Sequence, residues 1–146
     1  YEQAGDFREG RAPVLLGERW GFIDRCGKPT VPPVWQDVRP FSGGLAAVRS
    51  PKGWGWVDPA GRLVIAPRFE RVGEFSQGLA VARERGRTGY IDKRGHWAVA
   101  PRYDGAFAFH NELAHVIVGG RSAWIDRVGH FVLIPEASSL DLSPKP

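Results

Sequence analysis

The sequence contains almost no sulfur and no long apolar stretch. Among its 146 residues there is no methionine and one cysteine, Cys26. A single cysteine excludes an internal disulfide and a cysteine metal cluster. The apolar runs are only a few residues long, which argues against a membrane-spanning helix. No segment has a sustained helical period either, so the sequence predicts a β-rich chain.

What the sequence does contain is a block of 34 residues that occurs four times without insertion or deletion. The repeats are 1–34, 35–68, 69–102 and 103–136, followed by a C-terminal tail, 137–146. Two aromatic columns mark them, the first at Tyr1, Trp35, Phe69 and Tyr103 and the second at Phe7, Phe41, Phe75 and Phe109. A fixed period of this length is typical of stacked units, none of which buries its apolar face alone.

Within one block the residues predict three short strands. Residues 44–49 follow turn glycines, and residues 54–57 alternate so that Trp54 and Trp56 share one face. Residues 58–61 form a tight turn, and the third strand, 63–65, is expected to end at Pro67, which cannot donate a backbone hydrogen bond. Each block is therefore predicted to be a three-stranded antiparallel β-meander.

The middle strand holds a glycine between two large residues in the first three blocks, at Gly21, Gly55 and Gly89. The missing side chain is expected to leave room for an aromatic ring from a neighbouring strand or repeat. Trp20 and Trp54, which precede two of these glycines, are both expected to bury large areas.

The predicted architecture is all-β, with four meanders stacked as an elongated or curved array. A closed propeller-like ring is the alternative, although three strands per unit fall short of the usual four per blade. The outer blocks depart from the pattern at Arg11, Glu112 and Ser122-Ala123, as the ends of a finite stack require. This fits a complete array of four units, and further repeats before Tyr1 stay open.

The repeated motifs resemble those of the bacterial WG repeat family over nearly the whole chain. Trp20-Gly21-Phe22-Ile23-Asp24 and Trp54-Gly55-Trp56-Val57-Asp58 carry the resemblance, together with the spacers that begin at Phe41 and Phe75. Blocks three and four depart from it, with Thr88-Gly89 and Ser122-Ala123 at the naming motif. The resemblance implies a β-rich bacterial module with no established enzymatic activity. Both cytoplasm and periplasm stay open as its compartment.

One aspartate and one glycine recur in the predicted turn of every block. The set is Asp24, Asp58, Asp92 and Asp126 with Gly27, Gly61, Gly95 and Gly129. Carboxylates one repeat apart are too distant to share a metal ion or an acid/base role, so each aspartate is assigned to its own turn. The segment 110–115 has two histidines at the wrong spacing for a zinc helix. No metal site, cofactor or catalytic residue is predicted.

Basic residues gather at the predicted hairpin tips of the second and third blocks, each of which carries a net charge of +3. We expect contact with a partner through Arg49, Lys52, Arg85 and Arg87, with Trp35 or Trp97 as an apolar anchor. A solvated row of loops is the competing interpretation. The predicted partner is another protein, because no nucleic-acid-binding motif accompanies this charge. The basic tips favour an acidic partner surface.

The sequence therefore predicts a non-catalytic, monomeric repeat scaffold for protein–protein interaction, such as an adaptor or a toxin-neutralising arm. The alternative is a cell-envelope glycan binder that uses exposed aromatic side chains. An enzyme is not expected, because repeats without insertions rarely build a deep pocket with convergent polar groups.

Overall fold

The structure, a computed structural model, describes residues 3–133 and consists of β-strands and connecting turns over that range. The strands form four antiparallel sheets of four strands each, and every sheet follows the order of the chain. The all-β prediction is confirmed. Across residues 3–133 there is no helix long and apolar enough to cross a membrane.

Each sheet corresponds to about one repeat. The first contains β1 (Gln3–Ala4), β2 (Ala12–Leu16), β3 (Arg19–Ile23) and β4 (Pro29–Trp35). The second contains β5 (Asp37–Val38), β6 (Ala46–Ser50), β7 (Gly53–Val57) and β8 (Leu63–Phe69). The third contains β9 (Arg71–Val72), β10 (Ala80–Glu84), β11 (Arg87–Ile91) and β12 (Trp97–Tyr103). The fourth contains β13 (Gly105–Ala106), β14 (Ala114–Val118), β15 (Arg121–Ile125) and β16 (Phe131–Leu133). The tail predicted at 137–146 lies outside the described residues.

Each sheet has one strand more than the three predicted. The additional strand has two residues and pairs with the next one, as Asp37 and Val38 pair with Arg49 and Val48. The strand predicted to end at Pro67 also continues, because β8 runs on to Phe69. A four-stranded unit removes the strand-count argument against a propeller-like blade.

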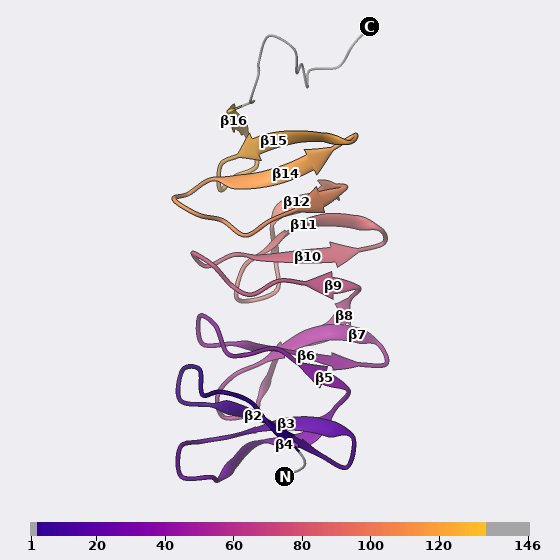
Figure 1. Cartoon of the computed structure of the whole chain (residues 1–146). Helices are drawn as coiled ribbons and strands as arrows, with labels where there is room; N and C mark the ends of the chain where they lie inside the picture. The colour runs from indigo at the N-terminus through magenta and orange to yellow at the C-terminus, as the bar shows by residue number, and fades with distance from the viewer. Residues whose placement is uncertain (1–2, 134–146) are drawn as a thin grey trace, which may run out of the picture.

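The four sheets are stacked one above another, with the first and the fourth at opposite ends of the molecule (Figure 1). The elongated arrangement predicted from the repeat is therefore observed, and the described chain does not close into a ring. The hairpins between the second and third strands of each sheet point to the same side of the stack (Figure 1).

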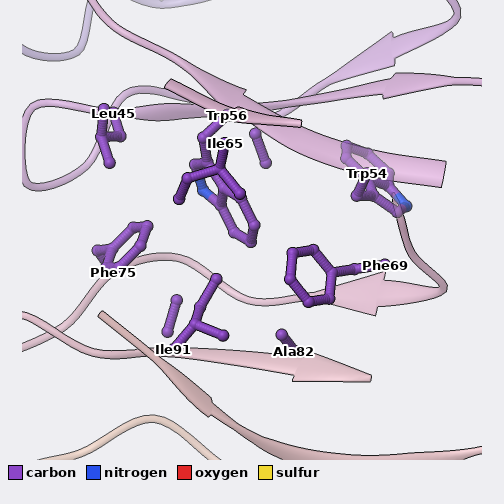
Figure 2. Packing of buried hydrophobic residues seen from close by; sticks show 10 residues of the cluster. Leu45, Trp54, Trp56, Ile65, Phe69, Phe75, Ala82 and Ile91 are labelled. Carbon is purple, nitrogen blue, oxygen red and sulfur yellow. The ribbon is translucent and has the colours of Figure 1, made fainter. Parts of the chain in front are cut away.

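Within residues 3–133 the core consists of three apolar clusters, one between each pair of neighbouring sheets. In the central cluster Trp54, Trp56 and Phe69 of the second sheet pack against Phe75 and Ile91 of the third unit (Figure 2). The other two clusters join the first unit to the second and the third to the fourth. The predicted shared face of Trp54 and Trp56 is confirmed, and the core lies between units rather than inside any one of them.

One edge-to-face ring pair recurs at all three interfaces. The ring centroids are 4.8 Å apart for Phe22–Phe41, 5.4 Å for Trp56–Phe75 and 4.7 Å for Tyr90–Phe109. In each pair the phenylalanine belongs to the later unit and packs on a middle-strand ring of the unit before it. Such pairs contribute roughly 0.5–1.5 kcal/mol beyond the burial of their area.

Trp20 and Trp54, both expected to bury large areas, differ in their burial. Trp54 is buried, with the guanidinium carbons of Arg39 and Arg49 at 4.9 and 5.9 Å from its ring centroid. Trp20 is only half-buried. The repeat explains the difference, because the first block has Gly5 and Leu15 where the second has the two arginines.

The middle-strand glycines make room for backbone rather than for an aromatic ring. A Cβ on Gly89 would lie 2.5 Å from the carbonyl oxygen of Val99 and 2.7 Å from the nitrogen of Pro101. Gly55 meets the backbone of β8 in the same way, at the point where the pairing of β7 with β8 shifts register. The glycine therefore leaves space for the backbone of the last strand around its proline, so that this strand continues beyond it. This corrects the expectation that the space is filled by an aromatic ring.

Candidate functional site

The aspartate column closes the turn before the last strand of every unit. In the second unit Asp58 Oδ1 accepts hydrogen bonds from the backbone N–H groups of Ala60 at 3.0 Å and Arg62 at 2.8 Å. The amide of Gly61 donates to the Asp58 carbonyl at 2.9 Å. Asp24, Asp92 and Asp126 accept the equivalent pairs of bonds. The carboxylates are thus used within their own turns.

These contacts lower the pKa of all four carboxyl groups. For Asp58 the largest cause is the hydrogen bond from the Arg62 amide, which outweighs partial burial, and the Arg62 side chain lowers the pKa further. The pKa of Asp24 and of Asp126 is lowered mainly by the amides of Lys28 and His130. At Asp92 burial raises the pKa, but the amides of His96 and Arg94 and nearby positive charge leave it lowered overall.

The lowered pKa values predict acid-sensitive turns. A carboxyl group whose pKa is lower in the folded chain than in the unfolded chain stabilises the fold when the pH is above its unfolded pKa, about 3.9. This contribution is lost as the pH falls through the folded pKa. Asp58→Asn keeps a side-chain oxygen that can accept the amide bonds but cannot titrate. We therefore expect the stability difference between wild type and Asp58→Asn to shrink as pH falls from about 6 to about 3. Urea unfolding at several pH values measures it, and a difference independent of pH would contradict the assignment.

The turn glycines of the second, third and fourth units have a second role, because each of these turns packs on the unit before it. A Cβ on Gly61 would lie 2.5 Å from the Thr30 carbonyl oxygen, and one on Gly95 would lie 3.1 Å from Ile65 Cγ2. The contact is reinforced by side chains of the earlier unit, since Arg68 donates to the Gly95 carbonyl at 3.1 Å. Only Gly27, in the first unit, has no atom within 4 Å of such a Cβ.

Gly61→Ala and Gly27→Ala separate these two roles. Both residues have positive φ, 87° and 83°, so each substitution is expected to cost roughly 1–2 kcal/mol of backbone strain. Gly61→Ala should cost about 1–3 kcal/mol more, because its Cβ overlaps the backbone of the first unit. Chemical denaturation of both variants measures the difference. Equal losses would show that the turn does not press on its neighbour.

The basic residues selected from the sequence lie at the hairpin tips on one side of the stack (Figure 1). Arg49, Lys52, Arg85 and Arg87 are all exposed. Arg87, however, is ion-paired with Asp104, with its Nη1 at 2.8 Å from the carboxylate. Arg49 lies near the Trp54 ring, whereas Lys52 and Arg85 have no ion-pair partner among the described residues. Of the four selected cations, Arg49, Lys52 and Arg85 therefore have no ion-paired carboxylate among the described residues.

The two tryptophans predicted as apolar anchors are half-buried parts of the packing. Trp97 lies edge-on to Phe69 of the preceding sheet, with ring centroids 5.7 Å apart. Trp35 pairs with Trp20 across β3 and β4 and packs against the first interface cluster. The structure therefore does not bring either ring to the basic tips as an exposed anchor.

The histidine-containing segment 110–115 forms a turn and the start of β14, as its alignment with 42–47 indicates. Asn111 and Glu112 have positive φ there, which a zinc-binding helix would not allow. Within residues 3–133, no three His, Cys, Asp or Glu side chains are grouped as a metal ion would need.

Sequence reasoning missed a run of stacked rings in the last unit. Phe107 stacks on His115 with centroids 5.0 Å apart, and His115 stacks on Trp124 at 5.2 Å. Phe107 is 55% exposed, and the other two side chains are half-buried. A signal was present in the columns, because Phe107 and His115 occupy positions that hold Arg39 and Ala47 in the second block.

The hollows of the described surface are shallow and partly apolar. One of about 470 Å³ lies beside Tyr103, Val118 and Phe131 in the last two units. Another of about 240 Å³ lies between the third and fourth units, where Arg71 and Asp104 contribute to its lining. Among the described residues that line either hollow, no hydroxyl is hydrogen-bonded to a carboxylate or an imidazole, the arrangement that activates a nucleophile in covalent catalysis.

Comparison with known proteins relates the fold to a repeat family. A solved structure described as "KlHsv2 with loop 6CD replaced by a Gly-Ser linker", a β-propeller-like protein, matches with a TM-score of 0.60 and 12% identity. The match covers 86% of this chain and 49% of that one, so this chain spans about half the length of the matched structure. This likeness concerns the fold alone. No curated protein sequence matches the chain. The family model "WG containing repeat" matches residues 1–20, 20–50, 54–87 and 89–121. The chain therefore belongs to the WG containing repeat family.

Proposed function

We propose that this chain is a non-catalytic repeat scaffold that binds an acidic surface of another protein through the hairpin tips of its second and third units. The observation that carries the proposal is the group of exposed cations at Arg49, Lys52 and Arg85, which lie on one side of the stack. Lys52 and Arg85 are in the turns between paired strands, so a rigid scaffold presents them to solvent.

The surroundings of the tips favour a protein partner over a small anion. Glu70, Glu84 and Asp104 neutralise Arg83, Arg68 and Arg87, with N–O separations from 2.8 to 3.5 Å. The remaining cations are therefore single charges spread over two adjacent units. An extended acidic surface can contact several such charges at once, and electrostatic attraction of this kind raises the association rate.

The glycan alternative requires several exposed rings along one side of the stack. Trp35 and Trp97 are half-buried, and the exposed Phe7, Phe107 and Phe131 belong to the first and last units. The non-catalytic part of the proposal is supported by the repeat architecture, since repeats without insertions seldom form deep catalytic pockets.

The test compares three forms of the protein as affinity baits for fractionated bacterial lysate. The first is wild type, and the second carries Lys52→Glu and Arg85→Glu. The matched control carries Lys28→Glu and Arg94→Glu, which change the net charge equally at exposed residues of the Asp-containing turns. Mass spectrometry then identifies the retained proteins at low and high salt.

A protein retained by wild type and by the control, but lost with the tip variant and at high salt, would support the proposal. Equal retention by all three baits would overturn it. Retention of envelope polysaccharide without a protein would instead favour the glycan alternative.

A further inference from the structure

A ring pair joins neighbouring units inside the stack, and one end of the stack carries the first partner of this pair while the other end carries the second. At every internal interface a phenylalanine of the later unit packs edge-on against a middle-strand ring of the earlier unit. The phenylalanine column begins with Phe7, for which residues 3–133 contain no earlier unit. The middle-strand column ends with Trp124, which has no later unit within the described residues.

The first end is less covered than its internal counterparts. Phe7 is 41% exposed, whereas Phe41, Phe75 and Phe109 are 0–5% exposed. The guanidinium of Arg25 lies 5.3 Å from the centre of the Phe7 ring. Ala12 and Val14, near the centre of the same face, are buried. The open part of this end is therefore the rim formed by Phe7 and Arg25.

The last end is less covered in the same way. Trp124 is half-buried, although Phe22, Trp56 and Tyr90 in its column are at most 1% exposed. Leu113 is half-buried as well, whereas its counterparts Leu45 and Leu79 are buried. This end therefore presents the partly exposed ring of Trp124 together with Leu113, whose counterparts in the second and third units belong to the interface clusters.

The charges at the two ends are also complementary. A second turn recurs in the units at residues 42–45, 76–79 and 110–113. In the last two internal interfaces the residue after the turn aspartate of the later unit lies beside this second turn of the earlier unit. Arg127 donates to the Gln77 carbonyl at 2.6 Å, and the Lys93 side chain lies against Gly43. At the open ends the equivalent positions are Arg25 and the turn that contains Asn111 and Glu112. An exposed cation would thus meet an exposed carboxylate.

We propose that the first unit of one molecule docks on the fourth unit of a second copy, in the manner of the internal interfaces. Phe7 would pack against Trp124 of the second copy, and Arg25 would pair with its Glu112. Such a contact joins two different surfaces, so repetition gives an open series of copies or a closed ring. The monomer expected from the sequence would then be the low-concentration form.

The first experiment is sedimentation velocity of the full chain from micromolar to millimolar concentration, for wild type, Phe7→Asp and Trp124→Asp. Wild type should rise in mass from 16.1 kDa to multiples of it, whereas each variant should stay monomeric because one of its ends is blocked. A mixture of the two variants should form a 1:1 dimer, since each contributes the intact end that the other lacks. Far-UV circular dichroism verifies that both variants are folded.

A second pair of variants avoids changes at apolar residues. Arg25→Glu and Glu112→Arg alter only exposed side chains, and each alone should weaken association by about tenfold or more. Mixing the two should restore association, because opposite charges then face each other at every contact. A wild type that stays monomeric over the whole range would overturn the proposal. Association that none of the four variants weakens, or that the mixtures do not restore, would also overturn it.

Discussion

Replacing Trp56 with alanine is expected to lower the free energy of unfolding by about 3–5 kcal/mol. Trp56 is 1% exposed and contacts Phe69 of its own sheet and Phe75 of the next unit, at centroid distances of 5.9 and 5.4 Å (Figure 2). Removing the indole would therefore leave a cavity at the interface between the second and third units. Urea unfolding followed by far-UV circular dichroism measures the loss.

The matched control is Trp124→Ala, because Trp124 holds the same repeat position at the end of the stack. It is half-buried and has no later unit packed on it within the described residues. Its loss should be clearly smaller than that of Trp56→Ala. Equal losses would mean that contacts between units contribute little to stability, contrary to the nearest-neighbour account of the stack.

Gly55→Ala is the second substitution with a large expected effect, about 3 kcal/mol, the upper end of the range for overpacking. A Cβ at this position would lie 2.7 Å from the nitrogen of Pro67 and would overlap the carbonyl of Ile65. These are backbone atoms of the paired strand, so no side-chain rotation relieves the overlap. Strands β7 and β8 would have to move apart at this point. Thermal and urea unfolding measure the cost.

The fourth unit provides the control for this substitution, because Ala123 occupies the glycine position there. Ala123→Gly should change stability by no more than about 1 kcal/mol, the usual difference between the two residues in a strand. If Gly55→Ala lowered the free energy of unfolding no more than Ala123→Gly, the close approach of the β8 backbone would not be the reason for glycine at position 55.

The repeat made much of the fold predictable, but not the features that depend on neighbouring strands. A two-residue strand such as Asp37–Val38 has no periodicity of its own and exists only because β6 pairs with it. The continuation of β8 past Pro67 depends on Gly55 in the next strand. Both features come from pairing between strands, which the hydrophobic pattern of one segment does not encode.

The candidate site shows the same division. The positions and exposure of Lys52 and Arg85 follow from the hairpin turns, which the sequence indicates directly. The pairing of Arg87 with Asp104 joins residues 17 positions apart and has no equivalent in the first two blocks. The same two positions hold Gly53 and Glu70 in the second block and Arg19 and Gln36 in the first, so one partner is missing in each. The half-burial of Trp97 depends on Phe69 in another sheet. Exposure of a variable column therefore cannot be inferred from its variation.

We infer that each unit is stabilised by its contacts with neighbouring units. Hydrogen–deuterium exchange of the dilute wild-type protein, analysed by mass spectrometry, tests this inference most directly. The account predicts that peptides from β7 and β11 exchange slowest, because both faces of their sheets are covered. Peptides from β3 and β15 should exchange faster, since each end sheet packs against only one neighbouring unit within the described residues. Uniform protection across all four units, or protection greatest in β3 and β15, would contradict the account.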